Sequence, residues 1–314
     1  MCRRYGVEET AESVGDPLAD GYLFFFRRME EWLQPDKEGF EPRVVALYKT
    51  LRKGLRFVTI ELDERDDAQV IFETLNAHGT PLLVADLVKN FLFHRVKAGK
   101  NELEKIYAKY WRHFDDDREF WSTPTGRGAA ARETIDVFLQ HYLVARTRRE
   151  VQVGHLFRGF REFAQGDGAV DAQAQLASLQ KYSRAYKEMR QAPADSREGE
   201  FLERLDQMEV GPVYPFVLEL VVNEPVSATE RRQCMVDIES FLVRRMVCGL
   251  TTKHYNRLFV DAMPMIGKGP GVAKRLREYL LAGEGDAVRW PSDEDFSTAW
   301  NSFPLYRRPG PRRV

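Results

Sequence analysis

Four residues in the first third of the chain could form part of a ligand site. Gln69, Glu73 and Asn76 are spaced so that they share one face of a helix, and Gly79 follows them. Amide and carboxylate groups on one face could hydrogen-bond a cofactor, and a glycine lets a backbone approach it closely. The Asn and Gly also fit a helix C-cap with its turn, which is the simpler interpretation and the one that the sequence alone favours.

A second candidate is an arginine in residues 234–259. At 100° per residue, Arg245 falls inside the apolar arc of a helix, next to Phe241, while Asp237 and Arg244 fall on the opposite face. A charge inside an apolar arc is costly unless it is paired and hydrogen-bonded. We therefore expect a carboxylate from another segment to bridge Arg245. The alternative is that the guanidinium reaches a phosphate.

Several common chemistries have no signature in this chain. The six histidines show no zinc-ligand spacing, and there is no P-loop, no Rossmann glycine pattern and no G-x-S-x-G motif. The three cysteines lie far apart, which is typical of a reducing compartment rather than of a disulfide framework. We therefore predict no metal site and no catalytic residue in this chain.

Composition limits the function classes further. The 314 residues contain 47 Lys and Arg against 48 Asp and Glu, so the net charge of -1 produces no overall field that would attract nucleic acid. Any nucleic-acid contact has to come from a local patch. No apolar run is long enough for a secretory signal or a membrane span. The expected location is the cytoplasm.

The stretch around the first candidate site is predicted to fold as strand, helix, turn and helix. Residues 57–62 alternate apolar and polar side chains and are rich in β-branched types, which is typical of a half-buried strand. The acidic run at 63–67 ends the strand and caps the helix that carries Gln69. Residues 76–81 stop that helix, and the next helix has Asp86 in its first turn.

The rest of the chain has helical periodicity. Residues 22–33 and 40–55 predict two helices, and amphipathic helices follow one another from residue 101, with a break at 122–128. Residues 214–222 are apolar nearly all round and predict a buried helix in the middle of a bundle. The predicted fold class is mainly α: a multi-helix bundle with a small α+β N-terminal remnant of one strand or a short sheet.

Two basic clusters are candidate phosphate contacts, although each is also compatible with a solvated helix face. Their members are Arg43, Lys49, Arg52 and Lys53 in the first cluster and Lys274, Arg275 and Arg277 in the second.

Residues 72–93, FETLNAHGTPLLVADLVKNFLF, resemble a signature of the GmrSD-type, modification-dependent (type IV) restriction endonucleases. Residues 238–259 are similar to the helical region of the same family. The resemblance implies a partial ParB/sulfiredoxin-like nucleotide-binding domain at residues 1–98 and a helical domain at 99–314. Asn76 and Gly79 match the end of that nucleotide-binding domain, and Gln69 and Glu73 share a helix face with Asn76. The expected cofactor-binding residues are therefore Gln69, Glu73, Asn76 and Gly79. The residues that the resemblance implies for nucleic-acid binding are Arg244, Arg245 and Lys253.

Catalytic motifs of that family are missing from this sequence. The full-length family uses a D-G-Q-Q-R motif linked to nucleotide hydrolysis and an HNH nuclease domain with a divalent metal. This chain has neither motif, and its ends look truncated. We therefore expect no cofactor bound in this chain and a restriction or defence protein that is inactive alone. The alternative is a non-enzymatic helical module that binds DNA or a separately encoded partner subunit. Its partners could also be the missing domains, supplied in trans, or a second copy of the same chain.

Overall fold

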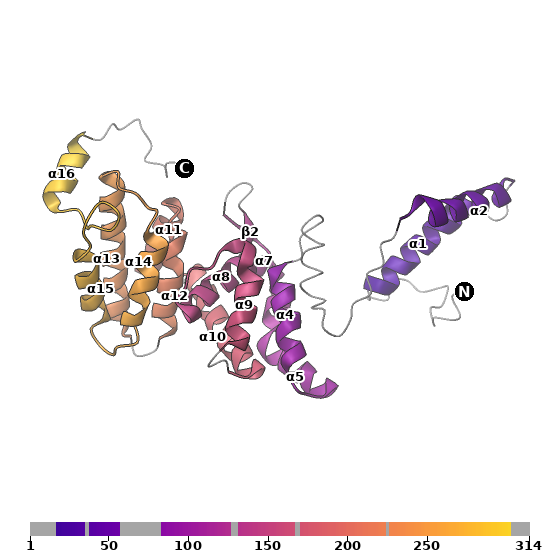
Figure 1. Ribbon diagram of the computed structural model, residues 1–314, viewed down its shortest axis with the longest axis horizontal. Helices are drawn as coiled ribbons and strands as arrows, with labels where there is room; N and C mark the ends of the chain where they lie inside the picture. Colours follow the sequence, from indigo (N-terminus) through magenta and orange to yellow (C-terminus); the bar gives the residue numbers. More distant parts are fainter. Residues whose placement is uncertain are drawn as a thin grey trace. The chain divides into compact units, whose positions relative to one another are not determined.

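The computed structural model describes residues 17–34, 38–56, 83–126, 131–166, 170–223 and 226–302. The chain divides into two compact units, Met1–Ala68 and Gln69–Val314. Within the described ranges the fold is mainly α, as the sequence predicts (Figure 1).

The first unit contains a pair of helices. Helix α1 (Pro17–Leu33) begins at a proline, whose fixed φ suits the first turn of a helix, and α2 (Phe40–Lys49) runs into a short π-helix, η2 (Thr50–Gly54). Arg43 holds the turn between them, because its Nε donates to the carbonyl of Leu33 at 2.8 Å. Both helices were predicted, but the second one changes to a π-helix where a single long helix was expected.

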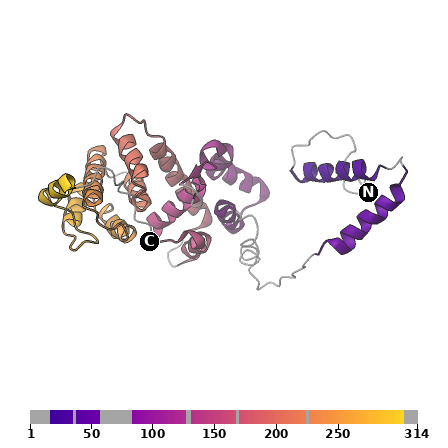
Figure 2. The same cartoon turned by 90° about the horizontal axis from the view of Figure 1, so that it is seen from above.

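The second unit is an array of helices that follow one another in chain order (Figure 2). Its first half contains α4 (Val84–Arg95), α5 (Lys100–Tyr110), α6 (Arg112–Asp116), α7 (Arg118–Trp121), α8 (Thr134–Thr147), η4 (Val153–His155), α9 (Leu156–Gln165) and α10 (Ala172–Arg190). Its second half contains α11 (Arg197–Gln207), η5 (Gly211–Val213), α12 (Tyr214–Val222), α13 (Ala228–Val247), α14 (Tyr255–Ala262), η6 (Met263–Met265), α15 (Val272–Leu281) and α16 (Asp293–Ser302).

Helix α12 lies at the centre of the array, as its uniformly apolar sequence predicts. Phe216, Val217, Leu218 and Leu220 are completely buried. The helix packs against α8 and α10 on the side of the first half and against α14 on the side of the second half. This helix therefore joins the two halves of the unit through one continuous core.

Helix α4 is attached to the same body. It packs on α8, α9 and α10, and its apolar residues Leu87, Val88 and Leu92 are buried. A side chain of α8 caps its first turn, since Asp136 Oδ1 accepts a hydrogen bond from the backbone N–H of Ala85 at 3.0 Å. The sequence-based division after residue 98 is a prediction about family domains, and in the structure α4 belongs to the second compact unit.

One short β-pair is present in the described ranges. Strands β1 (Pro124–Thr125) and β2 (Arg132–Glu133) run antiparallel, with Thr125 opposite Arg132. Strand β1 falls in residues 122–128, which the sequence analysis assigns to a break. The predicted strand at 57–62 lies outside the described residues. Among the helices that are described, none has the length and apolar character needed to cross a membrane.

The cap on α4 can be tested by substitution. We expect Asp136→Ala to lower the free energy of unfolding by about 1 kcal/mol, because the first turn of α4 loses an acceptor. Asp136→Asn keeps an acceptor oxygen and should retain most of the stability. The measurement is urea unfolding together with amide hydrogen exchange at Ala85. Equal stability and exchange in all three proteins would contradict the capping role.

Candidate functional site

The four predicted cofactor-binding residues lie outside the described part of the chain. Gln69, Glu73, Asn76 and Gly79 all fall between residues 57 and 82, so their role stays a prediction. Helix α4, which follows them directly, carries three further residues of the family motif. Asp86 and Asn90 are exposed, whereas Lys89 forms an ion pair with Asp115 at 2.5 Å and joins α4 to α6.

Arg245 is completely buried, as its place in the apolar arc predicts, but its partners differ from the expected ones. Its guanidinium donates to four backbone carbonyl oxygens and to the hydroxyl of Tyr255, and it lies over the rings of Phe241 and Tyr255. The four carbonyls belong to Thr251, Asp286, Ala287 and Arg289, at 2.7–3.1 Å. No carboxylate forms an ion pair with Arg245 within the described ranges, so the predicted ion pair is wrong. The alternative of phosphate contact has no support here, because Nε, Nη1 and Nη2 of Arg245 all donate to Tyr255 or to backbone carbonyls already.

The other two predicted nucleic-acid contacts have different surroundings. Arg244 donates to the carbonyl of Pro291 at 3.2 Å and forms an ion pair with Asp293, so it fastens α16 to α13. Lys253 lies exposed in the turn before α14. Of the three predicted residues, Lys253 is therefore the one whose charge is open to solvent.

The remaining predictions for α13 and α15 also need correction. Asp237 was placed on the face opposite the apolar arc, yet it is 1% exposed and pairs with Arg277 at 2.6 Å. Arg275 donates to the backbone carbonyls of Met265 and Gly269. In the second basic cluster, therefore, both arginines have partners within the fold, although the side chain of Arg277 is still 53% exposed, and Lys274 is 81% exposed.

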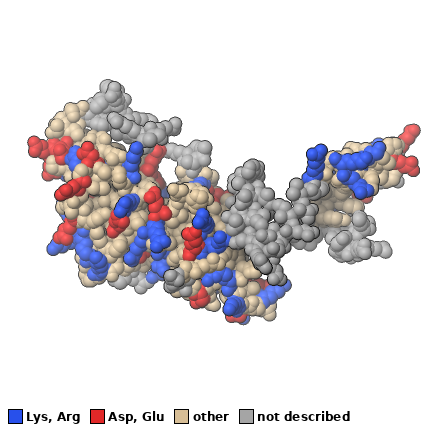
Figure 3. Space-filling view, in the orientation of Figure 1, with Lys and Arg blue, Asp and Glu red and all other residues tan. Residues whose placement is uncertain are grey.

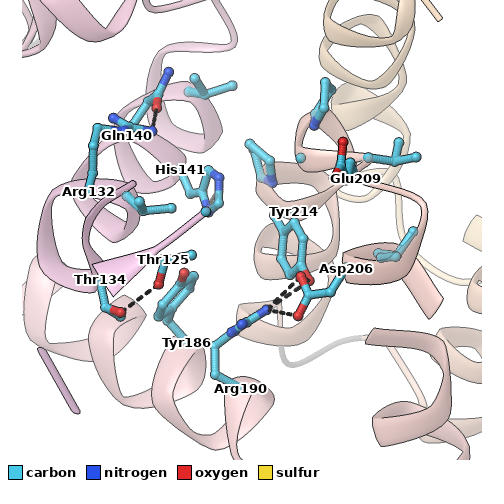
Figure 4. Close-up of a pocket in the computed structure, with 18 of the residues that line it drawn as sticks. Thr125, Arg132, Thr134, Gln140, His141, Tyr186, Arg190, Asp206, Glu209 and Tyr214 are labelled. Carbon is cyan, nitrogen blue, oxygen red and sulfur yellow. Dashed lines mark hydrogen bonds and ion pairs between the residues drawn. The ribbon is translucent and has the colours of Figure 1, made fainter. Parts of the chain in front are cut away.

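A pocket of about 990 Å³ lies within the second unit (Figure 4). One wall comes from β1, β2 and α8, the opposite wall from α11, η5 and α12, and the floor from α10. Its volume is near the upper end of the roughly 300–1,000 Å³ that is usual for small-molecule sites. The described residues contain no group of three or more His, Cys, Asp and Glu side chains that could hold a metal ion.

On the wall formed by β2 and α8, a chain of hydrogen bonds orients one arginine. The amide of Gln140 donates to the carbonyl of Val151 at 2.8 Å, and its oxygen accepts from Nη2 of Arg132 at 2.8 Å. The second terminal nitrogen of Arg132, Nη1, is buried and has no hydrogen-bond partner in the part of the chain that the structure describes. Burial lowers the pKa of Arg132, since desolvation disfavours its charged form. An oriented guanidinium with an unused buried donor is suited to bind an anion through a hydrogen bond that it donates.

On the opposite wall, a second arginine is already neutralised. Arg190 forms an ion pair with Asp206 at 3.0 Å and donates to the hydroxyl of Tyr214 at 2.8 Å. The Tyr214 hydroxyl in turn donates to Asp206. Burial raises the pKa of Tyr214, with Asp206 adding to the shift, so the phenol keeps its proton. These three side chains form a closed network that fixes the α10–α11–α12 corner of the pocket.

A histidine and a tyrosine occupy the space between the two arginines. The ring of His141 stacks on Tyr214 with centroids 5.5 Å apart. Its Nδ1 is buried and has no partner. Desolvation, with Arg132 and Arg190 adding to it, lowers the pKa of His141 to about 3, so the ring is neutral near pH 7. Burial raises the pKa of Tyr186 to about 12, and its hydroxyl has no hydrogen-bond partner among the described side chains.

Sequence reasoning did not find this pocket. Arg132, His141, Tyr186, Arg190 and Tyr214 come from β2, α8, α10 and η5–α12, and no local motif connects them. Their spacing along the chain is irregular. Tertiary packing, rather than a shared helix face, directs each side chain into the pocket. The one local signal was the polar pair Gln140 and His141 inside an otherwise apolar helix.

Comparison with known protein families finds a match for the N-terminal part of the chain. Residues 13–93 match the family model of the GmrSD restriction endonuclease N-terminal domain, which confirms the resemblance that residues 72–93 indicate. No curated protein and no solved structure matches the chain. The match ends inside α4, so every residue that lines the pocket lies outside it.

The role of Arg245 in the fold can be tested by its removal. We expect Arg245→Met to lower the free energy of unfolding by on the order of 3 kcal/mol, because four backbone carbonyls lose their charged donor. Arg245→Lys should recover only part of this loss, since an ammonium cannot reproduce the planar set of donors. The matched control is Arg257→Gln, whose side chain is 83% exposed, and it should change stability by less than about 0.5 kcal/mol. Urea unfolding measures all three, and an unchanged midpoint for Arg245→Met would refute the role.

Proposed function

We propose that this chain is a component of a GmrSD-type DNA restriction system and that it does not cut DNA or hydrolyse nucleotide by itself. The observation that carries the proposal is the match of residues 13–93 to the N-terminal domain of these restriction endonucleases. The absence of D-G-Q-Q-R from the sequence supports the inert state, because hydrolysis needs a phosphate cradle, a base and metal ligands held together. In this proposal the helical body is the scaffold on which partner domains act.

The inert state has a direct test. The full chain is incubated with ATP or GTP and a supercoiled plasmid in the presence of Mg²⁺, and phosphate release and nicked DNA are measured. We expect both to equal the values of a heat-inactivated sample. The control is a purified nuclease acting on the same plasmid, which shows that the DNA can be cut. Reproducible hydrolysis or nicking that follows the protein through two purification steps would contradict the proposal.

A second candidate function is a non-enzymatic module that binds DNA, and the first unit supports it. Lys49, Arg52 and Lys53 are exposed at the end of α2 and in η2, and Figure 3 shows basic side chains along this unit. On the second unit, the face shown in Figure 3 has acidic and basic side chains interspersed. Any phosphate contact in this proposal therefore starts from the α2–η2 end of the first unit.

Association with a partner is part of the same proposal. Helix α1 exposes large apolar side chains, including Phe24 at 56%, Phe25 at 65% and Trp32 at 50%. An apolar face of this kind is typical of a surface that another protein covers. A partner subunit, domains supplied in trans or a second copy of the chain would each serve this role, and a membrane is not required.

DNA binding by the full chain is best measured as a function of salt. We expect the logarithm of the association constant to fall with the logarithm of salt concentration, by about 0.9 for each phosphate neutralised. The variant Lys49→Gln/Arg52→Gln/Lys53→Gln removes three positive charges. The slope should therefore become shallower by the amount that corresponds to the loss of up to about three phosphate contacts. Arg257→Gln, at an arginine of the second unit whose side chain is 83% exposed and which belongs to neither basic cluster, is the control and should leave the slope unchanged. Absence of binding at low salt would exclude this second function.

A further inference from the structure

The pocket of the second unit contains donors that the protein does not use. Among the described residues, Arg132 Nη1 is buried without a hydrogen-bond partner, and so is Nδ1 of His141. The hydroxyl of Tyr186, on a side chain that is 1% exposed, has no hydrogen bond to any described residue. In Figure 4, Arg132 and His141 lie on one wall, and Tyr186 lies on the floor beside them. Folded proteins rarely leave several neighbouring polar groups unpaired unless something else binds them.

The charges around these groups favour an anion. Arg132 has no carboxylate as a hydrogen-bond partner, whereas Arg190 has Asp206. His141 is neutral near pH 7, so its ring can donate or accept one hydrogen bond without adding charge. Asp136 lies close enough to offset part of the charge of Arg132 without a hydrogen bond, so this part of the pocket contains one guanidinium whose charge is only partly compensated. A single anionic group of the size of a phosphate or carboxylate would neutralise it with a charge-assisted hydrogen bond.

The walls favour a ligand that also has a flat ring. Phe120, Tyr186 and Tyr214 contribute aromatic surface, and Val137, Val144 and Val210 contribute aliphatic surface. Flat rings bind between such side chains by stacking and by burial of apolar area. The volume of about 990 Å³ accommodates a ring system together with its anionic group.

The mouth of the pocket limits how much negative charge the ligand can have. Glu150, Glu203 and Glu209 line it with exposed side chains. Carboxylates at the entrance repel a chain of phosphates, whether it belongs to a nucleoside triphosphate or to a DNA strand. They tolerate a ligand whose one anionic group lies deep in the pocket, and they can accept hydrogen bonds from sugar hydroxyls.

We propose that this pocket is a binding site for a free nucleoside monophosphate, with its phosphate at Arg132 and Tyr186 and its base against the aromatic side chains. The described residues that line it belong to residues 120–260, a different part of the sequence from Gln69, Glu73 and Asn76, which the family resemblance implies for nucleotide binding. The site also stands independently of the proposed role in DNA restriction, because its lining residues lie outside the matched region. Binding of this kind would make the helical body a sensor of a small nucleotide.

The experiment is calorimetric titration of the full chain with 5′-AMP, adenosine, inorganic phosphate, ATP and a 5′-phosphorylated oligodeoxynucleotide. We expect 5′-AMP to bind at least about tenfold more tightly than adenosine or phosphate, because each of these lacks half of the contacts. ATP and the oligonucleotide should bind more weakly than 5′-AMP. Tighter binding of either, or no binding of 5′-AMP, would overturn the proposal. The oligonucleotide distinguishes a free nucleotide from the end of a DNA strand.

Three variants locate the binding in the pocket. Arg132→Gln should weaken 5′-AMP by about tenfold or more, and Tyr186→Phe, which removes a hydroxyl and keeps the ring, by a few-fold. Arg158→Gln, on the exposed face of α9, is the matched control and should bind as the unaltered protein does. Circular dichroism shows whether Arg132→Gln is folded, and Tyr186→Phe supplies the test if it is not. Unchanged affinity in a folded Arg132→Gln and in Tyr186→Phe would place the ligand elsewhere and overturn the proposal.

Discussion

The burial of one short apolar helix organises the second unit. Helix α12 is apolar nearly all round, so it is stable only where other helices cover every face of it. Helices α8 and α10 cover one side and α14 the other, and this requirement joins the two halves of the array. The pocket lies at the N-terminal end of the same helix, where Tyr214 faces His141 across the gap between α12 and α8. Thus the constraint that forms the core also creates the cavity.

Arginine side chains bind the irregular parts of the chain to this core. Arg245 donates hydrogen bonds to backbone carbonyls of two loops. Arg275 donates to carbonyls in the turn before α15, and Arg43 donates to the carbonyl at the end of α1, before the turn that leads to α2. In each case the acceptors are backbone carbonyl oxygens at a helix end or in a loop, which have no intrahelical donor. A planar group with five donors is well suited to several carbonyls at once. These arginines therefore stabilise the fold of the protein itself.

The parts that could be predicted from the sequence are those with periodic signals. The buried position of α12 and the burial of Arg245 both follow from winding apolar residues around a helix. The partners of Arg245 could not be predicted, because they come from turns at residues 251 and 286–289 whose course depends on tertiary packing. The pocket was missed for the same reason, since Arg132 and Tyr186 line one pocket only because α8, which β2 contacts, packs against α10. The family resemblance, in contrast, depended on contiguous residues, and the match to 13–93 confirms it.

The family match and the packing assign helix α4 to different parts of the protein, and this has a consequence for the evolution of the protein. Most of the sequence of α4 lies within the match to the restriction-endonuclease N-terminal domain, which ends at residue 93. Its apolar face, however, is buried against α8, α9 and α10, and its first turn is capped by Asp136. A recombination event that exchanged the N-terminal domain at its family boundary would bring in a foreign α4 without the surface that receives it. Domain shuffling at this boundary is therefore constrained, and residues of α4 should covary with those of α8 and α9 among relatives.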